Sequence, residues 1–112
     1  MYQIEYFTRL NGKTPACDWL NEQENRISAG LIAKFRMIEV EGLNLLKTNV
    51  LKRIVGQPDL YEIKYGDYRI ITYLDSRIDT FILLNGFRKQ RMNERREIQR
   101  GIRLKEEYLA FS

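Results

Sequence analysis

The chain has 112 residues and a mass of 13.4 kDa. A chain of this length buries roughly two thirds of its unfolded surface in one core and is too short for two cores. Hydrophobic residues make up 44% and charged residues 30%, which excludes disordered, collagen-like and membrane-embedded classes. The longest apolar stretch, residues 81–84 with Phe87 beyond it, is far shorter than the roughly 20 residues of a membrane span. We therefore predict one globular domain over residues 1–112.

The residue types that are absent restrict the chemistry. The N-terminal residues lack the basic and apolar regions of a signal peptide, and Cys17 is the only cysteine, which favours a reducing cytoplasm. Histidine is absent, so the commonest general base and nitrogen metal ligand are missing, and we expect no metal site and no cofactor. No phosphate-binding glycine loop or serine-hydrolase motif occurs. Any catalysis must then use Lys, Arg, Tyr, Asp or Glu.

The positive charge is concentrated near the C-terminus. The whole chain carries a net charge of +4 with a pI of about 9.3. The stretch from Arg88 to Glu107 contains eight basic and four acidic residues, so it accounts for all of that excess. This pattern suggests a surface for phosphate or for an acidic partner. A solvated helix face with Glu/Arg pairs is the alternative interpretation.

The first half of the chain predicts a strand and two helices. Residues 2–8 alternate apolar and polar side chains, as a half-buried strand does, and Asn11-Gly12 ends that pattern. Thr14 followed by Pro15 is typical of a helix start. A second, longer helix is predicted from apolar residues at helical spacing, which continue until Gly42 and residues 48–49 weaken the pattern: Ile27, Leu31, Ile32, Phe35, Ile38 and Leu46.

The second half predicts an antiparallel meander followed by a helix. Residues 60–65 and 68–74 are rich in β-branched and aromatic side chains, and Gly66-Asp67 between them is typical of a hairpin turn. Residues 75–77 form a further turn, and residues 78–87 a third strand. Asn93 is expected to cap a last helix with an apolar stripe of Ile98, Ile102 and Leu109. The fold class is therefore α+β, with helices packed on one antiparallel sheet.

A polar cluster is predicted on the hairpin. A two-residue turn places Tyr65 opposite Tyr68, Lys64 opposite Arg69 and Glu62 opposite Ile71. Lys64 and Arg69 then share a face, where like charges repel unless a carboxylate or an external anion lies nearby. One interpretation is a Glu62–Arg69 surface pair with Lys64 solvated. The other is a cationic phosphate site in which Glu62 orients the guanidinium.

Three motifs together resemble the RelE/ParE/HigB superfamily of bacterial toxins. They are residues 60–64 (Leu-Tyr-Glu-Ile-Lys), residues 68–70 (Tyr-Arg-Ile) and residues 83–89 (Leu-Leu-Asn-Gly-Phe-Arg-Lys), followed by a charged helix. The chain is most similar to the HigB-like, phage-derived branch, which implies a RelE-like fold. In that branch His more often stands at Asn85 and Lys at Gln90, so this chain departs from the pattern at both positions.

The resemblance implies a toxin of a type II toxin–antitoxin system that inhibits translation. Such a toxin is a metal-independent endoribonuclease, or mRNA interferase, that cuts messenger RNA on the ribosome by attack of the 2′-hydroxyl on the adjacent phosphate. That chemistry needs a proton acceptor, cations around the phosphate and a donor to the leaving oxygen. The implied partners are a helix-turn-helix, HigA-like antitoxin, mRNA and the ribosome, with DNA contacted only through the antitoxin.

The implied site residues follow motif position. Arg69 clamps the phosphate, Lys52 in the loop before the hairpin is a second phosphate ligand or proton-transfer group, and Glu62 orients Arg69 or acts as base. Arg88 and Lys89 complete the cationic pocket and assist the leaving group. The implied RNA-binding residues are Arg53, Lys64, Tyr68, Tyr73 and Arg91, although tyrosines in strands more often pack in the core or on the sheet surface.

Two other functions remain open from the sequence. A ParE-like protein with the same fold binds and poisons gyrase without cutting RNA. A phage-derived interaction module that has lost activity uses its basic tail to dock a partner. If RNA phosphates dominate binding, affinity should fall steeply as salt rises.

Overall fold

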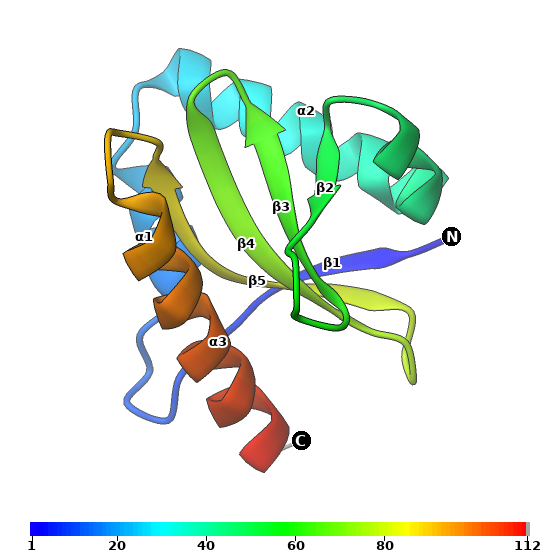
Figure 1. The fold of residues 1–112 in the computed structure, drawn as a ribbon, viewed down its shortest axis with the longest axis vertical. Helices are drawn as coiled ribbons and strands as arrows, with labels where there is room; N and C mark the ends of the chain where they lie inside the picture. The colour runs from blue at the N-terminus through cyan, green and yellow to red at the C-terminus, as the bar shows by residue number, and fades with distance from the viewer. Residues whose placement is uncertain (112) are drawn as a thin grey trace.

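The computed structural model describes residues 1–111 and forms a five-stranded sheet with helices on both faces (Figure 1). The strand order is β1-β5-β4-β3-β2. In chain order the elements are β1 (Gln3–Tyr6), α1 (Pro15–Asn21), α2 (Asn25–Glu41), the 3-10 helix η1 (Gly42–Lys47), β2 (Leu51–Arg53), β3 (Leu60–Tyr65), β4 (Tyr68–Asp75), β5 (Thr80–Arg88) and α3 (Glu94–Ala110). The predicted strand, two helices, meander and C-terminal helix are confirmed.

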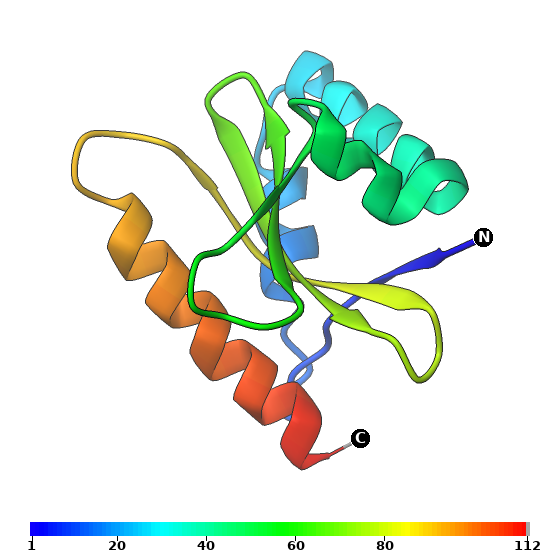
Figure 2. The same cartoon turned by 45° about the vertical axis from the view of Figure 1, so that its right-hand side comes forward.

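The sheet separates two hydrophobic cores, one on each face, where the chain length had predicted a single core. Helices α1 and α2 cover one face, and α3 crosses the other (Figures 1 and 2). The larger core contains apolar side chains of α1, α2 and the facing sides of the strands. Phe35 in this core is 4% exposed, and the partly buried Trp19 packs against the core. The smaller core joins Leu104 of α3 to Ile71, Ile82 and Phe87. Because strand side chains alternate between the faces, β3, β4 and β5 each contribute to both cores.

The predicted hairpin register is confirmed. Strands β3 and β4 pair antiparallel with Tyr65 opposite Tyr68, Lys64 opposite Arg69 and Glu62 opposite Ile71. Gly66 in the connecting turn has a φ of 57°, which glycine adopts without strain. The register of the hairpin is therefore fixed by its turn and places Glu62, Lys64 and Arg69 on the same side of the sheet.

Two predictions about the sheet are wrong. The sheet is mixed rather than antiparallel, because β1 pairs parallel to β5, with Gln3 opposite Thr80 and Tyr6 opposite Leu83. The segment containing Lys52 and Arg53 is not a loop but the short edge strand β2, paired antiparallel to β3. A strand of three residues has too little alternation for its period to stand out in the sequence.

The apolar stripe predicted for α3 is partly wrong. Ile98 and Ile102 are half-buried, but Leu109 is 40% exposed. Gly101 and Leu104 form the buried face instead. A Cβ at Gly101 would lie 2.7 Å from Cγ2 of Ile71, so the absent side chain lets α3 approach the sheet closely. Because glycine has no apolar side chain, Gly101 does not add to an apolar stripe in the sequence. The stripe therefore did not reveal the face of α3 that contacts the sheet.

No helix among residues 1–111 is both long and apolar enough to cross a membrane. The last residue of the predicted domain, Ser112, lies outside the described residues.

A buried carboxylate joins α3 to the end of β4. Asp75, 1% exposed, accepts a hydrogen bond of 2.7 Å from the Tyr108 hydroxyl and bonds of 3.0 and 2.8 Å from Nε and Nη2 of Arg77. The bonds from Arg77, and then the one from Tyr108, lower the pKa of Asp75 from 3.8 to about 2. Burial and the bond to Asp75 raise the pKa of Tyr108 from 10.0 to about 12.

Replacing Tyr108 by Phe should therefore destabilise the protein and change its pH dependence. The lowered pKa of Asp75 contributes stability above pH 3.8 that is lost as the pH falls through about 2, and the raised pKa of Tyr108 contributes stability below pH 10.0 that is lost as the pH rises through about 12. We expect Tyr108→Phe to lose about 1 to 2 kcal/mol at neutral pH and to show a weaker alkaline transition, measured by urea unfolding across pH. Tyr2→Phe is the control, because the Tyr2 hydroxyl makes no hydrogen bond with residues 1–111. Equal losses in both variants would contradict the prediction.

Candidate functional site

The candidate site lies on the face of the sheet that α3 crosses. Strand register arranges polar residues there in two neighbouring rows that run across the strands. The first row is Lys52, Glu62, Ile71 and Asn85, and the second is Lys64, Arg69 and Phe87. The hairpin register and the short strand β2 therefore bring two lysines, an arginine and a glutamate to one surface.

Arg69 is held rigidly at the centre of this surface. Its side chain is 7% exposed, and its Nη1 donates hydrogen bonds to the carbonyl oxygens of Gly66 and of Tyr68, the latter at 3.1 Å. Its Nε lies 3.5 Å from Oε1 of Glu62, close enough for an ion pair but without hydrogen-bond alignment. Its Nη2 has no hydrogen-bond partner among residues 1–111. The guanidinium is thus fixed in orientation with one donor group left for a ligand.

Glu62 belongs to a pair of carboxyl groups that the sequence did not indicate. Glu62 is 3% exposed and adjoins Glu94, the first residue of α3. Burial raises the pKa of Glu62, and Glu94 raises it further, while Arg69 and Lys52 oppose the shift. A carboxyl group with a raised pKa binds a proton more readily than an ordinary glutamate, so Glu62 is suited to accept and release a proton. Glu62 and Arg69 form the predicted pair, but it is buried rather than a surface pair.

Asn85 fastens α3 over the site. Its side chain is fully buried, and its Nδ2 donates to the carbonyl oxygen of Glu97 at 3.1 Å and to Oε1 of Glu97 at 3.4 Å. These bonds hold the first turns of α3 on β5 and so place Glu94 beside Glu62. Asn85, where the sequence departs from the motif that it resembles, is thus a residue that joins a helix to the sheet.

A cationic hollow opens beside Arg69. This hollow, called here the α3 hollow, has a volume of about 580 Å³ and is lined by Asp67, Arg69, Lys89, Gln90, Arg91, Met92, Glu94 and Arg95. Asn93 shapes the loop around it, since its Nδ2 donates to Arg88 and its Oδ1 accepts from the Gln90 amide. The hollow is therefore lined by four basic residues together with Asp67 and Glu94.

Three of the predicted cations and aromatics lie on the opposite face of the sheet. Arg53 is directed to the α2 side, where its guanidinium stacks 5.5 Å from the centre of the Tyr61 ring. Arg88 stacks in the same way over Tyr68, whose ring also packs near Trp19. Because neighbouring residues of a strand point to opposite faces, Arg53 and Arg88 diverge from Lys52 and Phe87, which point to the α3 side.

Tyr73 is placed away from Arg69. It lies on the α3 side but near the other end of β4, where it packs 5.9 Å from the Tyr108 ring and beneath the Lys105 ammonium. Lys89 and Arg91, in contrast, line the α3 hollow with Arg69. The structure thus brings together six predicted residues on this side, namely Lys52, Glu62, Lys64, Arg69, Lys89 and Arg91.

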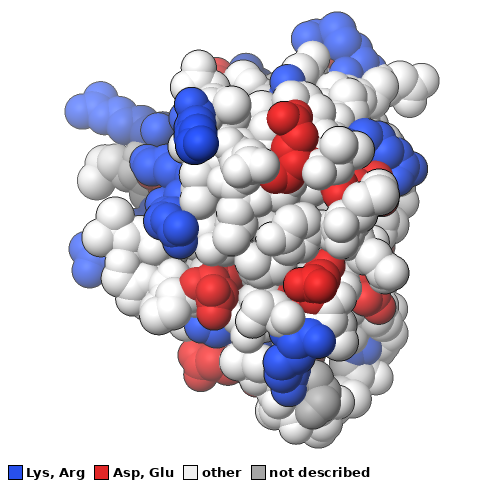
Figure 3. Space-filling model, turned by 90° about the vertical axis from the view of Figure 1, so that its right-hand side faces the viewer, with Lys and Arg blue, Asp and Glu red and all other residues white. Residues whose placement is uncertain are grey.

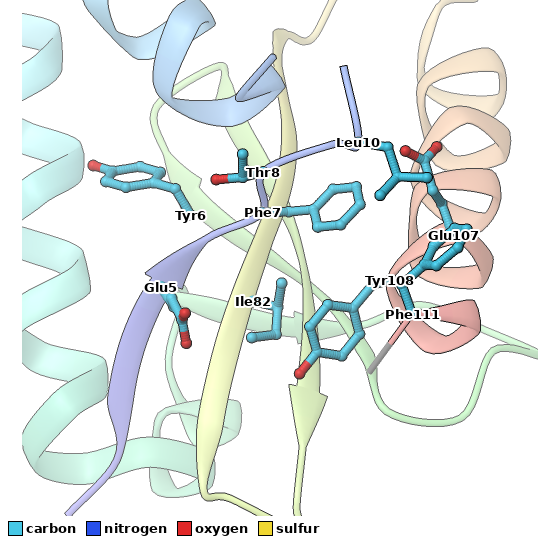
Figure 4. Close-up of a pocket in the computed structure, with 9 residues that line it drawn as sticks. All are labelled: Glu5, Tyr6, Phe7, Thr8, Leu10, Ile82, Glu107, Tyr108 and Phe111. Atoms are coloured by element: carbon cyan, nitrogen blue, oxygen red, sulfur yellow. The ribbon is translucent and has the colours of Figure 1, made fainter. Parts of the chain in front are cut away.

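A second hollow is apolar and lies elsewhere. It has a volume of about 270 Å³ between the end of β1 and the C-terminal part of α3, with Phe7, Ile82 and Tyr108 turned towards one another (Figure 4). Glu5 and Glu107 lie at its rim, and its lining contains no Lys or Arg. It shares no lining residue with the α3 hollow and is unsuited to an anion.

Among residues 1–111, no group of three or more His, Cys, Asp or Glu is arranged to hold a metal ion.

Comparison with solved structures identifies the fold. The chain superposes on the RelBE2 toxin–antitoxin complex of Mycobacterium tuberculosis with a TM-score of 0.60 and 19% identity, covering 79% of this chain and 98% of that one. It matches a mutant of the Escherichia coli toxin RelE in the free state with a TM-score of 0.66 and 14% identity, over 91% and 95% of the two chains. The archaeal RelE–RelB complex from Pyrococcus horikoshii matches with a TM-score of 0.61 and 17% identity, over 80% and 97%. No protein-family model and no curated protein matches the sequence. The chain therefore has the α+β fold of RelE toxins.

Removing the charge of Glu94 should shift the titration of Glu62. We expect Glu94→Gln to lower the raised pKa of Glu62 partway towards its ordinary value of 4.5, because burial still raises it. Because the pKa of Glu62 is raised in the folded state, the stability linked to its proton is present at low pH and is lost as the pH rises through the folded pKa. Carboxyl carbon NMR of Glu62 during a pH titration measures the shift. Glu106→Gln, on an exposed part of α3, is the control. An unchanged titration in Glu94→Gln would leave burial as the whole cause.

Proposed function

We propose that this chain is the toxin of a type II toxin–antitoxin system and a metal-independent endoribonuclease that cuts messenger RNA on the ribosome. The observation that carries the proposal is the fixed Arg69 guanidinium, with Nη2 directed to no protein acceptor, beside a hollow lined by basic side chains in a RelE-like fold. A phosphate ligand is what such a donor set recognises best. Within the superfamily we assign the chain to the HigB-like, phage-derived branch on its sequence motifs, and we place its action in the cytoplasm.

The proposed reaction uses the residues around Arg69. The RNA 2′-oxygen forms a bond to the adjacent phosphorus while the bond from phosphorus to the 5′-oxygen breaks. The Glu62 carboxylate, which lies beside Glu94, takes the proton of the 2′-hydroxyl. Arg69 and Lys52 stabilise the charge that builds on the phosphate oxygens, and the Lys89 ammonium donates a proton to the leaving oxygen. In a chain without histidine, the carboxyl pair supplies the missing base.

Substitution of Arg69 should abolish most cleavage in a cell-free translation extract. We expect Arg69→Lys to slow the reaction about a hundredfold or more, equivalent to about 2 to 4 kcal/mol, because lysine cannot present the fixed planar donors. Lys52→Ala, at an exposed position, should slow it as well without loss of folding. Mapping of the new 5′ ends on a translated message measures the rates.

Arg26→Ala is the matched control for this experiment, because Arg26 is an exposed cation on α2 that lines none of the hollows described above. It should cut as wild type does. Intact message in the presence of wild-type protein and translating ribosomes would overturn the proposed activity, as would full cleavage by Arg69→Lys. DNA breaks that depend on gyrase, with the message intact, would favour a ParE-like toxin instead.

The proposed partner is a helix-turn-helix, HigA-like antitoxin. Three of the matching structures are complexes of RelE with RelB or of RelBE type. We expect growth arrest when the chain is expressed alone and normal growth when it is co-expressed with a small helix-turn-helix protein from the adjacent gene. Co-purification of the two proteins checks the complex directly. Normal growth on expression of the wild-type chain alone would favour an inactive interaction module.

A further inference from the structure

Two more hollows follow the free edge of the sheet, and both are lined by basic side chains. The first, called here the edge notch, has a volume of about 460 Å³ and is lined by Lys34, Asn49, Val50, Lys64, Tyr65, Gly66 and Arg69. The second, the β2 hollow, has a volume of about 360 Å³ and is lined by Leu46, Thr48, Asn49, Leu51, Lys52, Arg53 and Lys64. They adjoin each other at Asn49 and Lys64, and neither lining includes Asp or Glu. On the side view in Figure 3, a group of basic side chains lies at the upper left, while further basic side chains lie at the upper right and below, where acidic ones lie among them.

The edge notch forms because α2 packs very closely on the end of the hairpin. A Cβ at Gly30 would lie 2.2 Å from the Tyr65 ring, so this packing requires glycine. Lys34 stands one helical turn further along the same side of α2. The close packing at Gly30 therefore places Lys34 in the same hollow as Lys64 and Gly66, at the end of β3.

The two lysines of the edge notch are half-buried and lack counter-ions. Neither Lys34 nor Lys64 makes an ion pair or a side-chain hydrogen bond with residues 1–111. Removing a cation from water without a partner is unfavourable, and an anion bound between two such cations offsets that penalty. The edge notch is therefore suited to bind an anion from outside the chain.

Arg69 connects the edge notch to the α3 hollow. Its side chain lines both hollows, although Lys34 stands on the α2 side of the sheet and Arg95 on α3. A polyanionic polymer that contacts Arg69 in the α3 hollow can therefore extend past Gly66 into the edge notch. A nucleic-acid backbone has this form, with one negative charge on every nucleotide.

We propose that the edge notch binds a second backbone phosphate of single-stranded RNA, next to the phosphate at Arg69, so that the strand crosses the sheet edge from α3 to α2. The inference rests on the proposed ribonuclease function and adds the path of its substrate. An acidic peptide is the less favoured occupant. Protein partners anchor through apolar side chains in pockets, whereas the edge notch offers only Val50 and Tyr65 among polar and charged groups.

The test is RNA binding by the full chain without ribosomes, as a function of salt. The probe is a fluorescent single-stranded RNA of about ten nucleotides, followed by anisotropy. We expect the double variant Lys34→Ala/Lys64→Ala to bind on the order of tenfold more weakly at 0.1 M salt, with a salt slope reduced by about 0.7 for each RNA phosphate that the variant no longer neutralises. Lys34→Arg/Lys64→Arg should restore both quantities, and thermal unfolding verifies the fold of each variant.

The matched control is Lys13→Ala/Arg26→Ala, which removes the same charge from exposed positions that line neither hollow. It should change the affinity and the salt slope little. Equal weakening in the two double variants would overturn the inference, because net charge alone would then explain binding. Unchanged RNA binding by the notch variant, with loss of binding to a polyglutamate peptide, would assign the edge notch to an acidic protein segment and also overturn it.

Cleavage assays separate this inference from the proposed function. If wild-type protein binds RNA through the edge notch but leaves messages intact, the ribonuclease proposal is wrong and the second phosphate site stands. If the notch variant cuts messages at the wild-type rate and binds RNA as tightly as wild type, the second phosphate site is wrong and the ribonuclease stands.

Discussion

Burying the Arg69 guanidinium beside the Glu62 carboxylate is the constraint around which the site is arranged. Two charges removed from water lose hydration that their attraction recovers only with good geometry and further hydrogen bonds. Here Gly66 and Tyr68 supply carbonyl acceptors to one nitrogen of Arg69, while its Nε remains without an aligned acceptor. The pair is thus incompletely satisfied within the chain. An arrangement of this kind fixes a side chain for a ligand rather than adding much to stability.

A second carboxyl group, that of Glu94, makes the burial of the Glu62–Arg69 pair less favourable. Glu94 adjoins Glu62 at the start of α3, and it raises a pKa that burial has already raised. Three contacts keep α3 in position: Asn85 bonds to Glu97, Gly101 lies against Ile71, and Tyr108 bonds to Asp75. Helix and sheet therefore meet through both apolar and polar groups, and the proton affinity of Glu62 depends on that docking.

Local sequence patterns predicted much of the fold, because hairpin turns and helical spacing act over a few residues. Gly66-Asp67 fixed the register that placed Glu62, Lys64 and Arg69 on one side, and this register was predicted correctly. The division of the cations between two faces was not predicted, because β2 is too short to be recognised and its alternation decides where Lys52 and Arg53 point. Glu94 was missed because the position of α3 over the sheet is a long-range contact. The parallel pairing of β1 has the same origin, since no local pattern specifies a partner so distant in the chain.

The pairing of β1 with β5 has a consequence for synthesis. Residues 3–6 acquire their strand partner only after residues 80–83 have left the ribosomal tunnel, and Glu94 follows later still. Contacts between such distant parts of a chain form late and slow the folding of the whole. A nascent polypeptide of this sequence therefore contains Lys52 and Arg69 before it contains β5 and α3, which complete the candidate site.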